Sequence, residues 1–297
     1  MTTTDDFTDL FAGRYDAHGS WTGGKQDGYP DYEAHLGNGP HIGVYCVNDN
    51  NECYWGCIDI DGKDFDSNWD NMWATAGNIQ EALAYKQIKA WTERTTNGIH
   101  VWVFPAAPVP AAIMRHALLA ACQVIDYLPK EVNPKQETLN PDKPYGNYVR
   151  LCYPGGLNGQ PVDRFVIDED GPMDLETFVT NACDERTDPV LLKEVAALYE
   201  PPPERKPMNL IADTKLIGEL YPILPPVVKM IFDDGPLNGD RSSALVKTAL
   251  ILRDEGWEPQ GVYWVLECLD SKLGKFVGRE DREDQLATIV ESYGVKH

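Results

Sequence analysis

The chain has 297 residues, of which 42% are apolar, and a formal net charge of −21 at pH 7. This length supplies ample material for one large domain or two smaller ones, and the apolar fraction is that of a globular protein. The acidic balance argues against a protein that coats nucleic acid without specificity, because such proteins are normally basic. The acidic net charge does not exclude an enzyme that binds nucleic acid through one local basic surface.

The sequence carries no targeting or membrane signal. No apolar run reaches the roughly 18 residues of a membrane span, and the N-terminus lacks the basic and apolar regions of a signal peptide. We therefore expect a cytoplasmic protein. Its seven cysteines are widely spaced and odd in number, which does not indicate a disulfide framework. Cys46, Cys53 and Cys57 contain no Cys-x-x-Cys pair, so we expect no zinc site, although the sequence leaves open whether these cysteines bind metal.

Strand and helix patterns are mixed through the first 200 residues. Residues 41–47 and 54–60 read as strands on either side of Asp49-Asn50-Asn51, which predicts a β-hairpin. Helical spacing of apolar residues after Asn78 predicts a helix over residues 79–91. Further strands are expected at residues 98–104, 148–152 and 165–167, and further helices at residues 111–127 and 174–182. This mixture predicts an α+β fold with a sheet covered by helices.

A proline-rich segment divides the chain at residues 201–208. Three consecutive prolines, Pro201 to Pro203, cannot continue a helix or a central strand, so we expect a stiff, extended linker. Beyond it, helical periodicity returns at residues 241–255, 259–269 and 282–293. The sequence thus predicts an α+β domain at residues 1–200, the linker, and a small all-α helical bundle at residues 209–297.

Two carboxylates end the strand predicted at residues 54–60. Side chains alternate between the faces of a strand, so Asp59 and Asp61 share one face while Ile58 and Ile60 share the other. Carboxylates held this close repel each other unless a cation lies between them. Mg²⁺ and Mn²⁺ are hard cations that bind carboxylate oxygens and substrate phosphates. Taken alone, an Asp-x-Asp pattern more often marks two aspartates that point into water, so the metal site depends on the rest of the chain.

Three further motifs follow Asp59-x-Asp61 in order: Arg94-Thr95-Thr96-Asn97-Gly98-Ile99-His100-Val101-Trp102, Glu131-Val132-Asn133-Pro134-Lys135-Gln136 and Gly146-Asn147-Tyr148-Val149-Arg150-Leu151. Together with Phe11-Ala12-Gly13-Arg14-Tyr15-Asp16 near the N-terminus, they resemble the archaeo-eukaryotic primase superfamily, specifically the primase-polymerases of phages, plasmids and mobile elements. The resemblance covers roughly residues 7–160, and the tail is similar to the helical C-terminal module of primases. It implies a catalytic core with an RRM-like sheet.

This resemblance implies a nucleotidyltransferase that acts as DNA primase and DNA polymerase. Such an enzyme synthesises and extends primers on single-stranded DNA from dNTP or NTP substrates, with two Mg²⁺ or Mn²⁺ ions at its site. The resemblance assigns catalysis and metal binding to Asp59, Asp61 and Glu131. Asp142 is the weaker alternative to Glu131 as the third carboxylate.

Nucleotide binding is expected of positively charged and hydrogen-bonding side chains that suit phosphate. The resemblance points to Arg14, Thr95, Thr96, Gly98, His100, Lys135 and Arg150. Many family members carry Ser at the position of Gly98, so here the hydrogen-bond donors would be backbone N–H groups and Thr95 or Thr96. Tryptophans can stack on bases, but for most of Trp55, Trp69, Trp73 and Trp91 we expect packing in the core.

Contacts with DNA are expected in the tail, through Arg241, Lys247, Arg253, Lys272, Lys275, Arg279 and Arg282. Because the tail is not net basic, we expect weak, salt-sensitive template binding. The sequence has no P-loop, so unwinding would need a separate helicase, and we expect a monomer. Two other functions are compatible with the residues: a non-catalytic replication-initiation or single-strand-binding protein on the same scaffold, and a metal-dependent nuclease.

Overall fold

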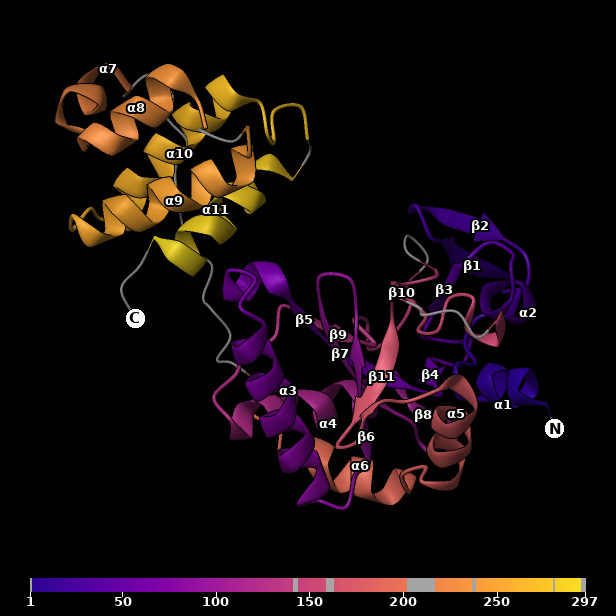
Figure 1. The fold of residues 1–297 in the computed structure, drawn as a ribbon. Coiled ribbons are helices and arrows are strands. Elements are labelled where there is room, and N and C mark those ends of the chain that lie inside the picture. Colours follow the sequence, from indigo (N-terminus) through magenta and orange to yellow (C-terminus); the bar gives the residue numbers. More distant parts are fainter. Residues whose placement is uncertain are drawn as a thin grey trace. The chain divides into compact units, whose positions relative to one another are not determined.

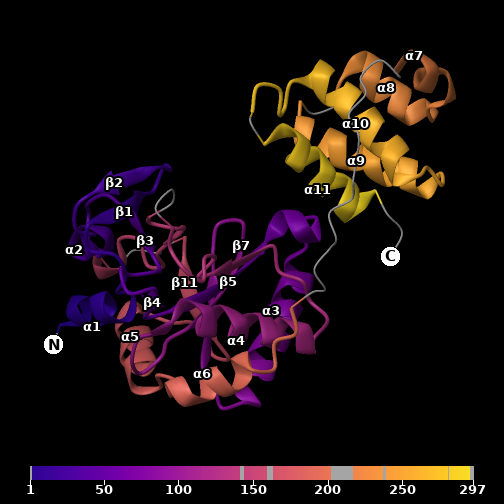
Figure 2. The ribbon, with the colours of Figure 1, turned by 180° about the vertical axis from the view of Figure 1, so that it is seen from behind.

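The computed structural model describes residues 2–140, 144–158, 163–201, 217–236, 239–279 and 281–294. The chain divides into two compact units, Met1–Pro201 and Pro202–His297. The first unit mixes helices with antiparallel strands, and the described part of the second is helical (Figures 1 and 2). The predicted α+β fold followed by helices is thus confirmed. Except for Pro201, the predicted linker lies outside the described residues.

The described strands of the first unit form three sheets. The largest has the order β12-β11-β6-β7-β5-β9, with the strands at Gly171–Pro172, Phe165–Asp168, Ala90–Arg94, Gly98–Val103, Gly56–Asp61 and Glu131–Asn133. A four-stranded sheet has the order β10-β3-β1-β2, with the strands at Tyr148–Arg150, Ile42–Tyr45, Ala17–Ser20 and Lys25–Asp27. The third sheet pairs β4, Glu52–Cys53, with β8, Val109–Pro110.

Both units contain helices. In the first unit they are α1 (Thr3–Leu10), α2 (Tyr32–Leu36), α3 (Trp69–Ala84), α4 (Ala111–Val124), α5 (Leu175–Asp184) and α6 (Pro189–Ala196), with short 3₁₀ helices η1 (Gly62–Phe65) and η2 (Gly156–Asn158). The second unit contains α7 (Ile217–Leu220), η4 (Tyr221–Ile223), α8 (Pro226–Asp234), α9 (Arg241–Asp254), α10 (Pro259–Leu273) and α11 (Arg282–Tyr293). No described helix is both long enough and apolar enough to cross a membrane.

Helices cover the face of the six-stranded sheet to which Gly56, Ile58 and Ile60 of β5 point. α3 packs on β6 and β7, and α4 packs on β5 and against α6 (Figure 2). A Cβ added to Gly56 would lie 2.5 Å from the sulfur of Met114 on α4. Ile58 and Ile60 share that face with Gly56 and are fully buried. Asp59 therefore points to the opposite face, away from α4.

The hairpin predicted for residues 41–47 and 54–60 is wrong. β3 and β5 belong to different sheets, because β3 pairs with β1 and β10 whereas β5 pairs with β7 and β9. A turn does occur between them, with Asn51 at φ 58°, but it leads into the short β4. The strands that flank β5 come later in the chain, and a local sequence pattern cannot reveal such long-range pairing.

The helix predicted at residues 79–91 is displaced. α3 begins at Trp69, where the side chain of Asn68 accepts a hydrogen bond from the backbone N–H of Asn71. After α3, Gln87 has φ 60°, and β6 follows from Ala90. The first four residues of β6 are buried, but its sequence places two apolar residues before three polar ones and so lacks the alternation that identifies a strand. The other predicted strands and helices are present, with bounds shifted by a few residues.

Candidate functional site

A row of ionisable residues crosses the six-stranded sheet on the face opposite to α4. Glu131 of β9 lies opposite Asp59 of β5, and Asp59 lies opposite His100 of β7. His100 in turn lies opposite Glu93 of β6. Directly opposed residues share a face of the sheet and lie close together, so four neighbouring strands present these side chains next to one another.

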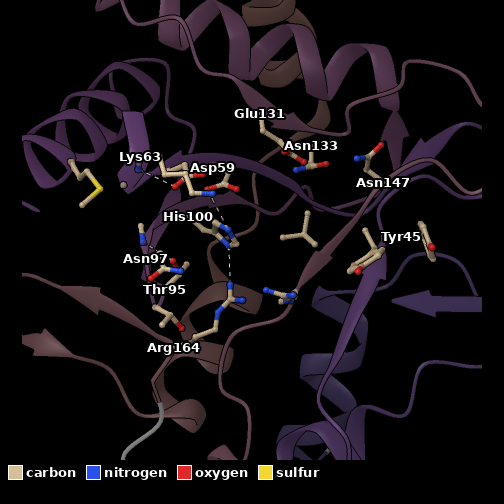
Figure 3. A pocket seen from close by; sticks show the side chains of 18 of the residues that line it. Tyr45, Asp59, Lys63, Thr95, Asn97, His100, Glu131, Asn133, Asn147 and Arg164 are labelled. Atoms are coloured by element: carbon tan, nitrogen blue, oxygen red, sulfur yellow. Dashed lines mark hydrogen bonds and ion pairs between the residues drawn. The ribbon is translucent and has the colours of Figure 1, made fainter. Parts of the chain in front are cut away.

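The acidic end of this row opens into a pocket of 1010 Å³ between the two larger sheets. Figure 3 shows His100 between Asp59 and Arg164, with dashed lines to both. The six-stranded sheet contributes Asp59, Asp61, Gly98, His100, Glu131 and Asn133, and the four-stranded sheet contributes Lys25, Tyr45, Tyr148, Val149 and Arg150. The pocket thus combines carboxylates with positively charged groups, which also include Lys63 and Arg164.

Asp59 is half-buried at the centre of the carboxylates. Its burial raises the pKa of this carboxyl, and the neighbouring Glu131 and Asp61 add to the effect while His100 opposes it. Nε2 of His100 lies 3.8 Å from Oδ1 of Asp59. Carboxylates that repel one another in this way are stabilised when a cation binds between them.

The buried carboxylate of Glu93 contacts His100 on the side away from Asp59. Nδ1 of His100 lies 3.0 Å from Oε2 of the fully buried Glu93, which also accepts hydrogen bonds from Nε1 of Trp102 at 2.8 Å and Nε of Arg164 at 2.7 Å. Burial alone would raise the pKa of Glu93, but Arg164 and His100 lower it to about 2. Nδ1 of His100 thus lies between Oε2 of Glu93 and Nη2 of Arg164, which is 3.1 Å away, and this leaves Nε2 to face Asp59 and the pocket.

The turn between β6 and β7 brings Thr95, Thr96 and Gly98 to the pocket. Oγ1 of Thr95 accepts the backbone N–H of Gly98 at 3.0 Å, so its hydroxyl proton is available to a ligand. A Cβ at Gly98 would lie only 2.3 Å from the carbonyl oxygen of Ile60. The close approach of the two strands therefore explains why this chain has glycine rather than serine there.

The third and fourth sequence motifs are tied together by side-chain hydrogen bonds. Nε2 of Gln136 donates to Oδ1 of Asn147 at 2.7 Å, and the backbone N–H of Asn147 donates to Oε1 of Gln136 at 3.2 Å. Arg150 lies exposed at the end of β10, with its guanidinium carbon 5.6 Å from the ring centroid of Trp21. These contacts hold Asn147 and Arg150 at the pocket wall.

Two predicted nucleotide-binding residues do not line the pocket. Lys135 is exposed in the loop after β9. Arg14 is buried, with Nε 2.7 Å from Asp16 and Nη1 2.6 Å from Asp49. Its charge is therefore already paired within the protein. Asp142, the alternative third carboxylate, lies outside the described residues.

Sequence reasoning missed Glu93, Arg164, Lys63 and Asn133. Glu93 stands among the polar residues Thr92, Arg94 and Thr95, so its charge gave no sign of burial, and Arg164 gave none because it precedes its strand. Lys63 stands two positions after Asp61, and it lines the pocket without an ion pair to any described residue. Asn133 lines the pocket as a buried residue, and its Oδ1 has no hydrogen-bond partner.

The donor set fits a hard divalent cation in its chemistry. Asp59, Asp61 and Glu131 offer carboxylate oxygens, and the unpartnered Oδ1 of Asn133 adds an amide oxygen. Within the ranges that the structure describes, no group of three or more His, Cys, Asp or Glu side chains is already close enough to hold a metal. Any ion would therefore be bound with help from a ligand or from movement of these side chains.

Most of the cations predicted to bind DNA make contacts inside the second unit. Arg282 donates to Oδ2 of the buried Asp270 at 2.7 Å, and Nη1 of Arg241 donates to the carbonyl of Gly274 at 2.8 Å. The others are Lys272, which donates to the carbonyl of Phe232, Arg253, which pairs with Asp254, and Lys275 and Arg279, which contact the ring of Phe276. Lys247 is exposed on α9. DNA binding by these residues stays a prediction.

Comparison with protein families finds a match over residues 29–166 to the family described as "TOTE conflict system, Archaeo-Eukaryotic Primase domain". The matched segment contains the whole row from Glu131 to Glu93, together with Arg164. No curated protein shows significant similarity to the chain. The match confirms the predicted resemblance to the archaeo-eukaryotic primase superfamily.

Proposed function

Because residues 29–166 belong to the archaeo-eukaryotic primase superfamily, we propose that the chain is a template-directed nucleotidyltransferase that makes and extends primers on single-stranded DNA. One observation carries the proposal. Glu131, Asp59 and His100 lie in register on three neighbouring strands and face one pocket. Nucleotidyl transfer requires anionic groups that hold cations and donor groups that hold a triphosphate, and this pocket contains both.

Asp59, Asp61 and Glu131 would hold Mg²⁺ or Mn²⁺. When bound, such ions stabilise negative charge on the attacking and leaving oxygens. The raised pKa of Asp59 and the unpartnered Oδ1 of Asn133 support this role, because both groups gain a partner when a cation binds. Since the carboxylates are not already clustered as a metal site among the described residues, we expect the ion and the triphosphate to bind together.

The cationic side of the pocket would hold the triphosphate of the incoming nucleotide. Nε2 of His100 faces the cavity, and the hydroxyl of Thr95 and the guanidinium of Arg150 can donate to phosphate oxygens. Lys63 supplies a further positive charge beside the carboxylates. These side chains would act by positioning and by stabilising charge, without forming a covalent intermediate.

The remaining partners are proposed from chemistry alone. The helical unit would add contacts to the template and the initiating nucleotide, with Lys247 as its exposed candidate. A separate helicase would supply single-stranded DNA, because the sequence lacks the P-loop of a nucleoside-triphosphate-driven motor. We propose that the protein acts as a monomer.

The test is incubation of the full chain with single-stranded DNA, labelled dNTP or NTP, and Mg²⁺ or Mn²⁺, with the products sized on a gel. New strands that depend on nucleoside triphosphates and release pyrophosphate would support the proposal. Glu131→Gln should be inactive, and near-normal rates would mean that another carboxylate completes the site. Shortened DNA without added nucleotides would identify a nuclease, and DNA binding without turnover would identify a non-catalytic binding protein.

A further inference from the structure

A second cavity, of 320 Å³, adjoins the pocket at Trp69. It is lined by Trp69 and Trp73 of α3, Arg94 of β6 and Ile167 of β11. The ring centroids of the two tryptophans are 6.4 Å apart, and the ring planes are inclined by 31°. Trp69 also lines the large pocket, so the two cavities share a wall. We call this second cavity the tryptophan cavity.

The two tryptophans are only half-buried. Each packs against the hydrophobic core on one side and borders the tryptophan cavity on the other. Core packing therefore accounts for part of each ring and leaves aromatic surface beside the large pocket. Exposed aromatic surface at such a position is typical of a binding site, because its exposure to water is unfavourable.

Arg94 adds a positive charge at the rim of the tryptophan cavity. It is exposed at the end of β6, with its guanidinium carbon 5.1 Å from the centroid of the Trp69 ring. It forms no ion pair with a described residue. The next two residues, Thr95 and Thr96, line the large pocket. A ligand in the tryptophan cavity would thus meet a flat apolar wall and, at its edge, an unpaired cation next to the proposed triphosphate site.

We propose that Trp69, Trp73 and Arg94 form a stacking site for one unpaired base of a single-stranded nucleic acid, with Arg94 contacting the adjacent phosphate. Any of the bases is flat and can stack on indole rings. The phosphate next to the base carries a negative charge that can pair with the guanidinium of Arg94. The volume of 320 Å³ lies at the small end of ligand sites, which suits one base. The proposal rests on the proposed function, since it places the strand next to the catalytic pocket.

The test measures binding without turnover, by fluorescence anisotropy of labelled oligo(dT) and oligo(rU) with the full chain and no nucleotide or divalent ion. Trp73→Leu keeps an apolar side chain but removes the ring, so affinity should fall roughly 5-fold to 100-fold. Trp73→Phe should retain most of the affinity. Arg94→Gln should lower the salt dependence of binding by about 0.7 in the log–log slope, whereas Trp73→Leu should leave that slope unchanged.

A matched control lies on the same helix. Tyr85 is the C-cap of α3, is 83% exposed, and has the ammonium of Lys86 5.3 Å from its ring centroid. Tyr85→Leu thus removes an exposed aromatic ring beside a cation at the end of α3 opposite to Trp69, and it should leave oligonucleotide affinity unchanged. An oligonucleotide of abasic residues should bind equally to the wild type and Trp73→Leu, because it offers no base to stack.

Three results would overturn the proposal: no binding of either oligonucleotide by the wild type, equal binding by the wild type and Trp73→Leu, or the same loss in Tyr85→Leu. If Trp73→Leu fails to fold, as judged by its melting temperature, Arg94→Gln at an exposed position still tests the proposal. A salt dependence of oligonucleotide binding equal to that of the wild type would then contradict it. The comparison of oligo(dT) with oligo(rU) identifies DNA or RNA as the preferred strand. Because the assay needs no incorporation, an inactive protein that still shows these differences would refute the proposed polymerase function alone.

Discussion

His100 and Glu93 lie opposite each other on β7 and β6, with Nδ1 of the imidazole 3.0 Å from Oε2 of the carboxylate. Glu93 does not line the pocket, yet it sets which nitrogen of His100 faces the pocket. The same carboxylate is the partner of the buried Arg164. One buried anion thus orients a proposed ligand-binding side chain and neutralises a buried cation.

Glu93→Gln should impair both stability and nucleotide use. It leaves Arg164 buried without its anion, and breaking a buried ion pair from one side typically costs about 3–5 kcal/mol in the free energy of unfolding. It also releases His100, so the nucleotide KM should rise. Denaturant unfolding and steady-state incorporation at a temperature where the variant is folded would measure the two effects separately.

The double variant Glu93→Gln/Arg164→Gln provides the control for that coupling. It removes both charges, so its loss of stability should be smaller than the sum of the losses in the single variants. If the loss of stability in the double variant equals the sum of the losses in the two single variants, Glu93 and Arg164 do not interact directly.

Asp59→Asn should abolish incorporation and raise the melting temperature of the metal-free protein. Burial and the neighbouring carboxylates raise the pKa of Asp59, so above its unfolded-state pKa the ionised carboxylate destabilises the folded state. Scanning calorimetry with and without Mn²⁺ tests this. Mn²⁺ should stabilise the wild type and have little effect on the variant, and active Asp59→Asn would contradict the site.

His100→Ala should raise the nucleotide KM, by at least about 10-fold if one charge-assisted hydrogen bond to the triphosphate is lost. Its affinity for oligonucleotides in the anisotropy assay should stay close to that of the wild type. A variant that loses oligonucleotide affinity but keeps its nucleotide KM would show that His100 contacts the strand instead of the triphosphate.

The sequence was sufficient to locate the pocket because its key contacts are either local or carried by a motif. Asp59 and Asp61 are two residues apart on one strand, and Gln136 bonds to Asn147 only 11 positions on. Glu131 was assigned from the motif, and the register between β5 and β9 brings it opposite Asp59. Each of these residues lines the pocket or braces its wall.

The sequence could not reveal contacts that depend on long-range strand order. Arg164 and Glu93 are separated by 71 positions, and their pairing requires β11 to lie beside β6. The same dependence made the β3–β5 hairpin prediction wrong. Arg14 stands in a family-like segment, but its neighbours Asp16 and Asp49 already bind its guanidinium. Charge counts cannot show which cations are paired in the folded chain.

His35 should make the protein less stable in mild acid. It is fully buried, Nε2 donates to the carbonyl of Cys152 at 2.8 Å, and Nδ1 accepts the backbone N–H of Ile42 at 3.2 Å. Burial lowers the pKa of His35 from 6.5 to about 4. Between these pH values His35 binds a proton in the unfolded chain but not in the folded one. The free energy of unfolding is therefore unaffected by His35 protonation above pH 6.5 and decreases as the pH falls toward 4.

The size of this effect is on the order of 3 kcal/mol between neutral pH and pH 4. His35→Gln cannot titrate, so its free energy of unfolding should change less with pH across this window than that of the wild type. Urea unfolding at several pH values would show the difference. Parallel pH curves for the two proteins would contradict a neutral, buried His35.

Removal of the second unit should separate primer initiation from primer extension. Initiation must hold two nucleotides and a template without a pre-formed duplex, so it benefits from the additional contacts of a linked second unit. Extension begins from a paired 3′ end, for which the proposed sites in the carboxylate pocket and the tryptophan cavity of the first unit would supply the contacts. Residues 1–201 form a compact unit of their own, which makes this truncation a reasonable one.

We expect residues 1–201 to extend a supplied primer and to fail at starting one, whereas the full chain does both. Products labelled at their 5′ end by the initiating nucleotide distinguish the two activities in one reaction. Trp73→Leu within the truncated protein should weaken extension further, because the strand then loses its stacking contact as well as the helical unit. Primer synthesis by residues 1–201 at the rate of the full chain would show that the helices are not needed for initiation.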